Sequence, residues 1–273
     1  MIRSHILPLV LLGGLVVAGT GCSGARGLQQ ITSAEAAFTE GKDLFDRGRH
    51  MRAIEYFQRV FDFGRGHVFA PDAQFYLAQS YFKTRQYLLA ANEFTRFVEF
   101  YRNDPRVEEG DYMRALSYVR LSPPYQLDQT DTHNALTFLR LYLGKHPEGK
   151  HSDEVIRLID EMRHKLARKQ FEIAELYETR GMNHAAAIEF LRLLETYPDS
   201  EFADNALFGA LRNYRDFAMR SIPTRRVERL ELAAEQYTRL AQLFPNSDVL
   251  PEARVVYQEV QDELRRLGHT AAR

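Results

Sequence analysis

The sequence lacks two features that would narrow its function at once: a pair of cysteines and an excess of charge of one sign. Cys22 is the only cysteine, so no disulfide can form within the chain. The 36 lysine and arginine residues nearly balance the 37 aspartate and glutamate residues. The formal net charge of -1 therefore gives no overall attraction to the phosphate backbone, and nucleic acid is not expected as a partner. With 45% hydrophobic and 27% charged residues, the chain is expected to fold.

The N-terminus has an apolar run that is too short to span a bilayer comfortably, which takes about 20 residues. This run, Ile6–Ala18, ends in small residues just before Cys22. The layout predicts a signal peptide over residues 1–21, an acylated Cys22, and a lipidated linker over residues 22–31, with a retained transmembrane helix as the weaker alternative. Each buried methylene of the lipid would contribute about 0.8 kcal/mol, enough in sum for permanent anchorage. No other cofactor and no metal is expected.

From Thr32 onward the apolar residues follow helical spacing, and five alanines recur in the same local context. Large side chains follow each alanine four and seven residues later, on the same helix face. A small residue on a partner helix lets the two backbones approach, and the large side chains fill the groove between them. The five sets are Ala53, Phe57 and Val60; Ala90, Phe94 and Phe97; Ala135, Leu139 and Tyr142; Ala186, Phe190 and Leu193; and Ala233, Tyr237 and Leu240. The partner-helix residues are Gly41, Ala78, Ala115 and Ala174, and the closing prolines are Pro147, Pro198 and Pro245.

This pattern of small residues, large residues and prolines is similar to the tetratricopeptide repeat, whose period is about 34 residues and whose helices pair antiparallel. We predict an all-α fold, a tetratricopeptide-repeat solenoid of five helical hairpins plus a C-terminal capping helix. Units one to three are expected over residues 32–147, units four and five with the capping helix over 148–268, and a tail over 269–273.

Most units are longer than the usual period, and the extra residues are assigned as follows. Unit three is expected to carry them in the loop 122–129, and unit four in one long helix, 152–177, with Ser152 as its N-cap. In unit five, the loop around Pro223 is expected to absorb them. The capping helix is expected over 251–267, with three valines facing inward: Val255, Val256 and Val260.

The first helices of such an array line its concave surface, and here they carry more aromatic residues than a solvated groove requires. Exposed aromatic clusters usually mark binding surfaces, so we predict a groove that accepts a peptide with aromatic side chains. The alternative is that these phenylalanines pack against the neighbouring repeat. The candidates are Phe38, Phe45 and Asp46 in unit one; Asp72, Phe75, Gln79, Phe82 and Lys83 in unit two; and Tyr112 and Arg120 in unit three.

Sites of catalysis are not evident. The closest histidines, His146 and His151, do not have metal-ligand spacing on one helical turn, and neither a phosphate-binding glycine loop nor a nucleophile elbow is present. The acidic run Glu108, Glu109 and Asp111 is predicted to be a solvated face. A basic segment on the long helix is predicted to be an exposed cationic face, with a charged partner surface as the alternative; it comprises Arg163, His164, Lys165, Arg168 and Lys169.

Several strings, taken in order, resemble the BamD family of outer-membrane protein assembly lipoproteins. They begin with Cys22 shortly before the first repeat and continue with Tyr112–Ser117 at the start of unit three. The proline-containing loop Ser122–Thr130, the stretch Leu166–Gly181 and the junction Tyr197–Ser200 follow. The resemblance covers the chain from Cys22 to about Leu267.

The resemblance implies a lipid-anchored scaffold on the periplasmic face of the outer membrane. It further implies that the C-terminal units bind the POTRA domain of a BamA-like β-barrel protein and that the N-terminal units bind unfolded outer-membrane protein clients. Family members often carry an arginine on the second helix of unit four, where this chain has Glu189. Candidate partner-binding residues are Glu189, Arg168 and Lys169. The alternative is another periplasmic repeat lipoprotein that coordinates cell-wall synthesis or division.

Overall fold

The computed structural model describes residue 28 and residues 31–268. Within this part the chain forms eleven α-helices and one short 3-10 helix, and no strand. The helices are α2 (Ala34–Asp46), α3 (His50–Val60), α4 (Ala70–Lys83), α5 (Tyr87–Phe100), α6 (Val107–Leu121), α7 (Thr130–Lys145), α8 (Ser152–Thr179), α9 (Asn183–Thr196), α10 (Ala203–Met219), α11 (Pro223–Leu243) and α12 (Leu250–Arg266), and the 3-10 helix η1 is Phe61–Phe63.

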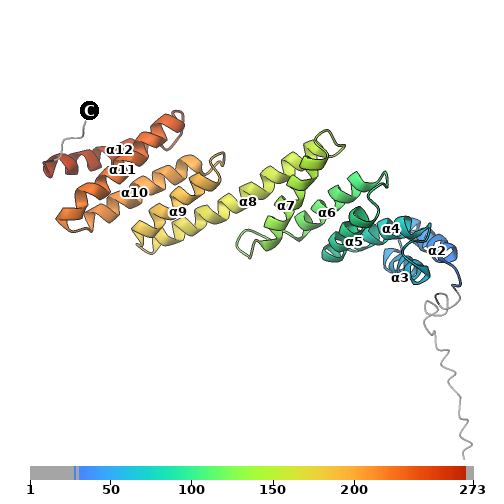
Figure 1. The fold of residues 1–273 in the computed structure, drawn as a ribbon. Coiled ribbons are helices and arrows are strands. Elements are labelled where there is room, and N and C mark those ends of the chain that lie inside the picture. Colours follow the sequence, from blue (N-terminus) through green and yellow to red (C-terminus); the bar gives the residue numbers. More distant parts are fainter. Residues whose placement is uncertain (1–27, 29–30, 269–273) are drawn as a thin grey trace, which may run out of the picture.

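Consecutive helices pair into five hairpins, α2 with α3 through α10 with α11, and α12 covers the last hairpin. Figure 1 shows the hairpins stacked into an elongated, curved array with α2 at one end and α12 at the other. The predicted solenoid of five hairpins and a capping helix is confirmed. No helix in the described ranges combines the length and apolar character needed to cross a bilayer.

The alanine register explains how the helices fit together. All five alanines are 0% exposed, at the crossing points where a larger side chain would push two backbones apart: Ala53, Ala90, Ala135, Ala186 and Ala233. Glycine lets the partner helix approach equally closely. A Cβ at Gly41 would lie 2.9 Å from the Phe57 ring, and a Cβ at Gly209 would lie 2.7 Å from the Phe190 ring. Small residues therefore set the approach of helices both within a hairpin, as at Gly41, and between neighbouring hairpins, as at Gly209.

Three helices end where the sequence places proline. Pro147, Pro198 and Pro245 each stand two residues beyond the last helical residue of α7, α9 and α11. Proline cannot donate the backbone hydrogen bond that would continue the helix. The loop 122–129 between α6 and α7 also lies where unit three was expected to carry its extra residues.

Three local expectations were wrong. Ser152 does not cap α8, because its hydroxyl donates to the His146 carbonyl at 2.8 Å and His151 holds the N-cap position. Pro223 is the first residue of α11, where its fixed φ suits a helix, so the extra length of unit five lies in the helices rather than in a loop. In α12, Val256 and Val260 face inward, but Val255 is exposed.

Helix α8 joins the two halves of the array. Its 28 residues span about 42 Å, at 1.5 Å per residue. The first half packs on hairpin three through Val155, Met162 and Leu166, whereas the second half carries Phe171 and Ala174 into the core of hairpin four. The continuity of α8 therefore couples two hydrophobic clusters.

Candidate functional site

Two predicted groove residues lie inside the array. Phe75 is 5% exposed and packs its ring 5.1 Å from that of Phe97, and the Arg106 guanidinium lies over the Phe75 ring at 5.0 Å. Tyr112 is 6% exposed and stacks on the His151 ring at 3.8 Å. The expectation that these two side chains line an open groove is wrong, because each fills the space between neighbouring helices. The alternative, packing against the repeat, holds for both.

The other aromatic candidates keep part of their surface open. Phe38 stacks on Phe69 at 5.5 Å, and Phe45 meets Tyr76 edge-on at 5.1 Å, so the first helices of hairpins one and two share a half-buried row of rings. Phe82, also half-buried, lies farther along α4. This row gives the N-terminal units a partly accessible aromatic surface on α2 and α4.

The polar candidates of the groove differ in solvent exposure and in whether they form ion pairs. Lys83 and Arg120 are exposed, and Gln79 is half-buried. Asp46 forms an ion pair with Lys42 at 2.5 Å, and Asp72 forms one with Arg106 at 2.6 Å. The Asp46 and Asp72 carboxylates therefore already have partners within the N-terminal hairpins.

The basic segment of α8 holds the long loop 122–129 in place. The Lys165 ammonium donates to the Ser122 hydroxyl at 2.7 Å, and the Lys169 ammonium donates to the Leu127 carbonyl at 2.5 Å. Arg168 lies over the Tyr125 ring at 4.5 Å. Three of the five residues of the predicted cationic face thus contact a segment of the same chain, and a role of Arg168 and Lys169 toward a partner stays a prediction.

The Glu189 carboxylate is bound by a glutamine and an arginine, in an arrangement that occurs twice in the array. Gln170 on α8 donates to the Glu189 carboxylate at 2.5 Å, and Arg192, one turn later, pairs with the same carboxylate at 2.8 Å. Hairpin two repeats this arrangement at the same sequence spacing with Gln74, Glu93 and Arg96. The Glu189 side chain is therefore held within its own hairpin, and its role toward a partner stays a prediction.

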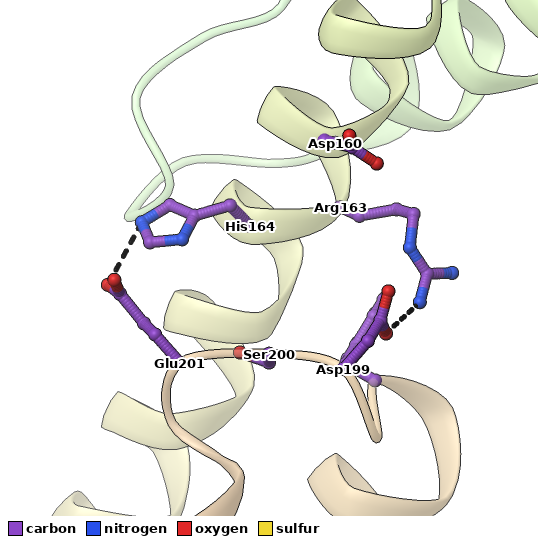
Figure 2. A pocket seen from close by; sticks show the side chains of 7 residues that line it. Asp160, Arg163, His164, Asp199, Ser200 and Glu201 are labelled. Atoms are coloured by element: carbon purple, nitrogen blue, oxygen red, sulfur yellow. Dashed lines mark hydrogen bonds and ion pairs between the residues drawn. The ribbon is translucent and has the colours of Figure 1, made fainter.

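A polar cavity with a volume of about 330 Å³ lies between α8 and the turn from α9 to α10 (Figure 2). Arg163 on α8 pairs with Asp199 in the turn, and His164 faces Glu201 at 3.4 Å. The turn is set by Pro198, which follows the end of α9, and by backbone bonds through Ser200. The lining residues are Asp160, Arg163, His164, Tyr197, Asp199, Ser200 and Glu201.

Negative charge dominates this cavity. Three carboxylates face one guanidinium, and Arg163 holds the pKa of Asp199 below its usual range by hydrogen bonding to it. Burial raises the pKa of Tyr197, which keeps that hydroxyl neutral. Asp160 forms no ion pair within the described part of the chain. The arrangement suits a cationic side chain from a partner, and it offers no activated nucleophile.

The acidic run of unit three is not a solvated face, contrary to the prediction. Asp111 is 0% exposed and pairs with Arg114 at 2.5 Å, while Lys145 and His146 approach the same carboxylate within 3.2 Å. The Glu108 carboxylate accepts from the Tyr142 hydroxyl at 2.9 Å, which lowers the pKa of Glu108. The run therefore ties α6 to the end of α7.

Two predictions remain, the acylated cysteine and the absence of a metal site. Cys22, the predicted acylation site, lies outside the described residues. Among the described residues, no group of three or more histidine, cysteine or carboxylate side chains is placed to hold a metal ion.

Comparison with known proteins places the chain in a family. The family model described as YfiO, outer membrane lipoprotein, matches residues 30–230, from the start of hairpin one into α11. The outer membrane protein assembly factor BamD of Caulobacter vibrioides is 24% identical over 216 residues, covering 76% of this chain and 70% of that protein. BamD of Rickettsia prowazekii is 25% identical over 212 residues, covering 77% and 84%. BamD of Haemophilus influenzae is 23% identical over 213 residues.

Solved structures with a similar course of the chain include a TPR repeats protein from Bacteroides fragilis, 11% identical with a TM-score of 0.44, covering 85% of this chain and 100% of that one. A TPR domain pair of yeast Sti1 is 13% identical with a TM-score of 0.42, covering 85% and 84%. The assignment follows from the family model, which spans more than half of the sequence. The chain belongs to the BamD (YfiO) family of outer membrane lipoproteins, the family of outer membrane protein assembly factors.

Proposed function

We propose that this protein is a lipid-anchored scaffold of the machinery that assembles β-barrel proteins in the outer membrane, and that it carries out no chemistry of its own. The observation that carries the proposal is the family match over residues 30–230, which takes in four complete hairpins and part of the fifth. Acylated Cys22 would hold the array on the periplasmic face of the membrane. The surfaces of the hairpins would then bind the clients and the other subunits.

The N-terminal hairpins would receive unfolded outer-membrane protein clients. The half-buried row on α2 and α4 supports this role, because its open members Phe38, Phe45 and Phe82 present ring surface beside Gln79 and the exposed Lys83. Transmembrane β-strands end in aromatic girdles, so a client segment carries side chains that match such a row. Backbone and carboxylate groups of the segment would meet the polar side chains.

The C-terminal hairpins would bind the POTRA domain of a BamA-like barrel subunit. The acidic cavity beside α8 supports this assignment, since Asp160, next to the Arg163–Asp199 pair, has no ion-pair partner among the residues that the structure describes. A lysine or arginine of the partner inserted there would complete the charge balance of the cavity. The residues first proposed for this contact, Glu189, Arg168 and Lys169, would contribute only if they exchanged their present partners within the chain.

Affinity isolation of the tagged full chain from solubilised outer membranes, followed by mass spectrometry, tests the scaffold role. We expect recovery of a POTRA-bearing barrel protein. The Asp160→Lys variant should lower that recovery at least tenfold, because a like charge then meets the cation of the partner. Glu161→Lys is the matched control: it makes the same charge change at the adjacent exposed residue, which does not line the cavity.

The same experiment separates the alternative role in cell-wall synthesis or division. Recovery of cell-wall synthases without any POTRA-bearing barrel protein would contradict the proposal. Equal recovery with Asp160→Lys and with the unchanged chain would leave the scaffold role standing and would remove the acidic cavity from the interface.

A further inference from the structure

Two lysines of α8 hold the loop between α6 and α7. The Lys165 ammonium donates to the Ser122 hydroxyl at 2.7 Å, and the Lys169 ammonium donates to the Leu127 carbonyl at 2.5 Å. The two lysines are four residues apart, so they lie on the same face of the helix. The loop, residues 122–129, therefore runs along α8 in the manner of a bound peptide.

An aromatic ring of the loop lies, in sequence, between these two contacts. The Arg168 guanidinium is 4.5 Å from the centre of the Tyr125 ring, and the Tyr125 hydroxyl donates to the Glu172 carboxylate at 2.5 Å. A guanidinium over an aromatic ring is attractive, and a hydrogen bond to a carboxylate is stronger than one between neutral groups. We call the α8 surface under the loop the basic stripe: Lys165, Arg168, Lys169 and Glu172.

The loop contributes no side chain to the hydrophobic cores. None of the residues 122–129 belongs to a hydrophobic cluster of the array, and Leu127 is 58% exposed. Burial of apolar surface is the main force that fixes a segment in a folded protein. The loop is therefore held on α8 by polar contacts, which a competing segment can replace.

The two loop oxygens that bind the lysines would keep a partner if the loop were released. The Leu127 carbonyl also accepts from the Gln129 amide at 3.0 Å, and the Ser122 hydroxyl also forms a hydrogen bond with the Thr132 hydroxyl at 2.6 Å. An oxygen that loses its only hydrogen bond inside a protein is costly, whereas these two retain one each. Opening the loop therefore orphans neither oxygen.

The two ammonium groups are not paired with a carboxylate. Both donate to neutral oxygens, and neither forms an ion pair within the described part of the chain. The carboxylate of the loop, Asp128, instead accepts from the Thr130 backbone at 2.9 Å. Burial lowers the pKa of Lys165, so its charge is partly desolvated without a counter-charge in contact. A carboxylate would offer both lysines a charge-assisted hydrogen bond, which is stronger than a bond to a hydroxyl or a carbonyl.

We propose that the basic stripe is the docking site of an extended acidic segment of another protein, bearing an aromatic side chain, and that the loop occupies this site until the segment displaces it. Carboxylates of the segment would meet Lys165 and Lys169, and its ring would replace that of Tyr125 at Arg168. The inference deepens the proposed function and rests on it for the existence of a partner at Arg168 and Lys169.

The surroundings of the stripe favour a single chain over a broad anionic surface. Glu172 and Glu175 follow the cations on α8, and burial together with the neighbouring Glu172 charge raises the pKa of Glu175. A membrane surface or a nucleic acid backbone would bring phosphates against these carboxylates. A peptide can instead direct single carboxylates at the two lysines, as the loop directs its hydroxyl and its carbonyl.

Binding of a labelled peptide to the full chain tests the proposal. The probe is a short fluorescent peptide of alternating glutamate and tyrosine, and its comparison is the same peptide with glutamine in place of glutamate. By fluorescence anisotropy, we expect the glutamate peptide to bind about tenfold more tightly, because its bonds to the lysines are charge-assisted. Lys165→Gln with Lys169→Gln should abolish this preference. The control, Lys150→Gln with Arg157→Gln, removes two exposed charges near the start of α8 and should retain it.

Weakening the loop should have the opposite effect. The apparent dissociation constant is the intrinsic one divided by the fraction of chains whose loop is open. Tyr125→Ala removes both contacts of the ring and raises that fraction, so the glutamate peptide should bind about tenfold more tightly than to the unchanged chain. Gln126→Ala is the matched control, since Gln126 is exposed in the same loop, and it should leave the affinity unchanged.

Three results would overturn the proposal: equal affinity for the glutamate and glutamine peptides, no gain from Tyr125→Ala, or an equal loss of preference in the control for the lysines. Binding of anionic lipid vesicles through the two lysines, without binding of the glutamate peptide, would assign the stripe to a membrane and also contradict it. The peptide measurement needs no natural partner, so failure to recover a barrel protein by affinity isolation counts against the proposed function alone. Far-UV circular dichroism of each variant verifies that the helices remain folded.

Discussion

Replacing Asp111 with alanine is expected to lower the free energy of unfolding by about 3–5 kcal/mol, the cost of removing one partner from a buried ion pair. Asp111 is completely buried, and its partner Arg114 is nearly so. Burial already lowers the pKa of Arg114, and the nearby Asp111 charge opposes that shift. Without the carboxylate, the guanidinium keeps its desolvation cost and loses its nearest counter-charge. Urea denaturation followed by circular dichroism measures the change.

Glu148→Ala is the control for this prediction, because Glu148 is exposed and its loss should change stability by less than about 0.5 kcal/mol. A double variant, Asp111→Leu with Arg114→Met, should recover much of the lost stability, since an apolar pair carries no uncompensated charge. A loss below about 1 kcal/mol for Asp111→Ala would show that the cluster between α6 and α7 contributes little to the fold.

Breaking α8 in its middle is expected to uncouple the two halves of the array. Arg168→Pro removes a backbone donor between Leu166, which belongs to the core of hairpin three, and Phe171, which belongs to that of hairpin four. Proline inside a helix costs about 3 kcal/mol or more. Because the cost falls on the helix that contributes core residues to both clusters, we expect thermal unfolding to separate into two transitions, observable by calorimetry.

Arg168→Ala separates the backbone effect from the loss of the side chain. Alanine removes the contact with the Tyr125 ring and the weak bond to Glu172, and it keeps α8 intact. This variant should unfold with the same number of transitions as the unchanged chain. If Arg168→Pro unfolded with the same number of transitions as the unchanged chain and without loss of stability, the two halves would not be coupled through α8.

The repeat architecture could be predicted from the sequence because its determinants are local. Ala186, Phe190 and Pro198 lie within one helix and its end, and their spacing alone identifies a crossing point, a packing face and a stop. All three have the predicted roles in the structure. Pro223 shows the limit of such reasoning, since proline suits both a turn and the first position of a helix.

The exposure of the first-helix aromatics could not be predicted in the same way. Phe45 and Phe75 both lie on first helices, yet Phe75 is buried and Phe45 is half open. The difference depends on how each hairpin is rotated against the next, which no single helix encodes. Packing between units therefore decides which rings remain available for binding.

Ion pairs between helices had a sequence signal that the pattern of apolar residues did not bring out. Asp111 and Lys145 are 34 residues apart, as are Glu178 and Arg212, and 34 residues is also the usual repeat period. Arg163 and Asp199, in the acidic cavity, are 36 apart. Opposite charges separated by about 34 residues are thus candidates for contacts between helices, within a unit as for Asp111 or between units as for Glu178, and this criterion would have identified Asp111 as paired rather than solvated.

Depletion of the protein in its own cells tests the central claim most directly. With the gene under a repressible promoter, folded outer-membrane barrels are followed by their heat-modifiable mobility on gels. The proposed scaffold role predicts that folded barrels decline in step with the protein, before cell shape changes. Normal barrel levels in depleted cells that fail to divide or to build their wall would contradict it.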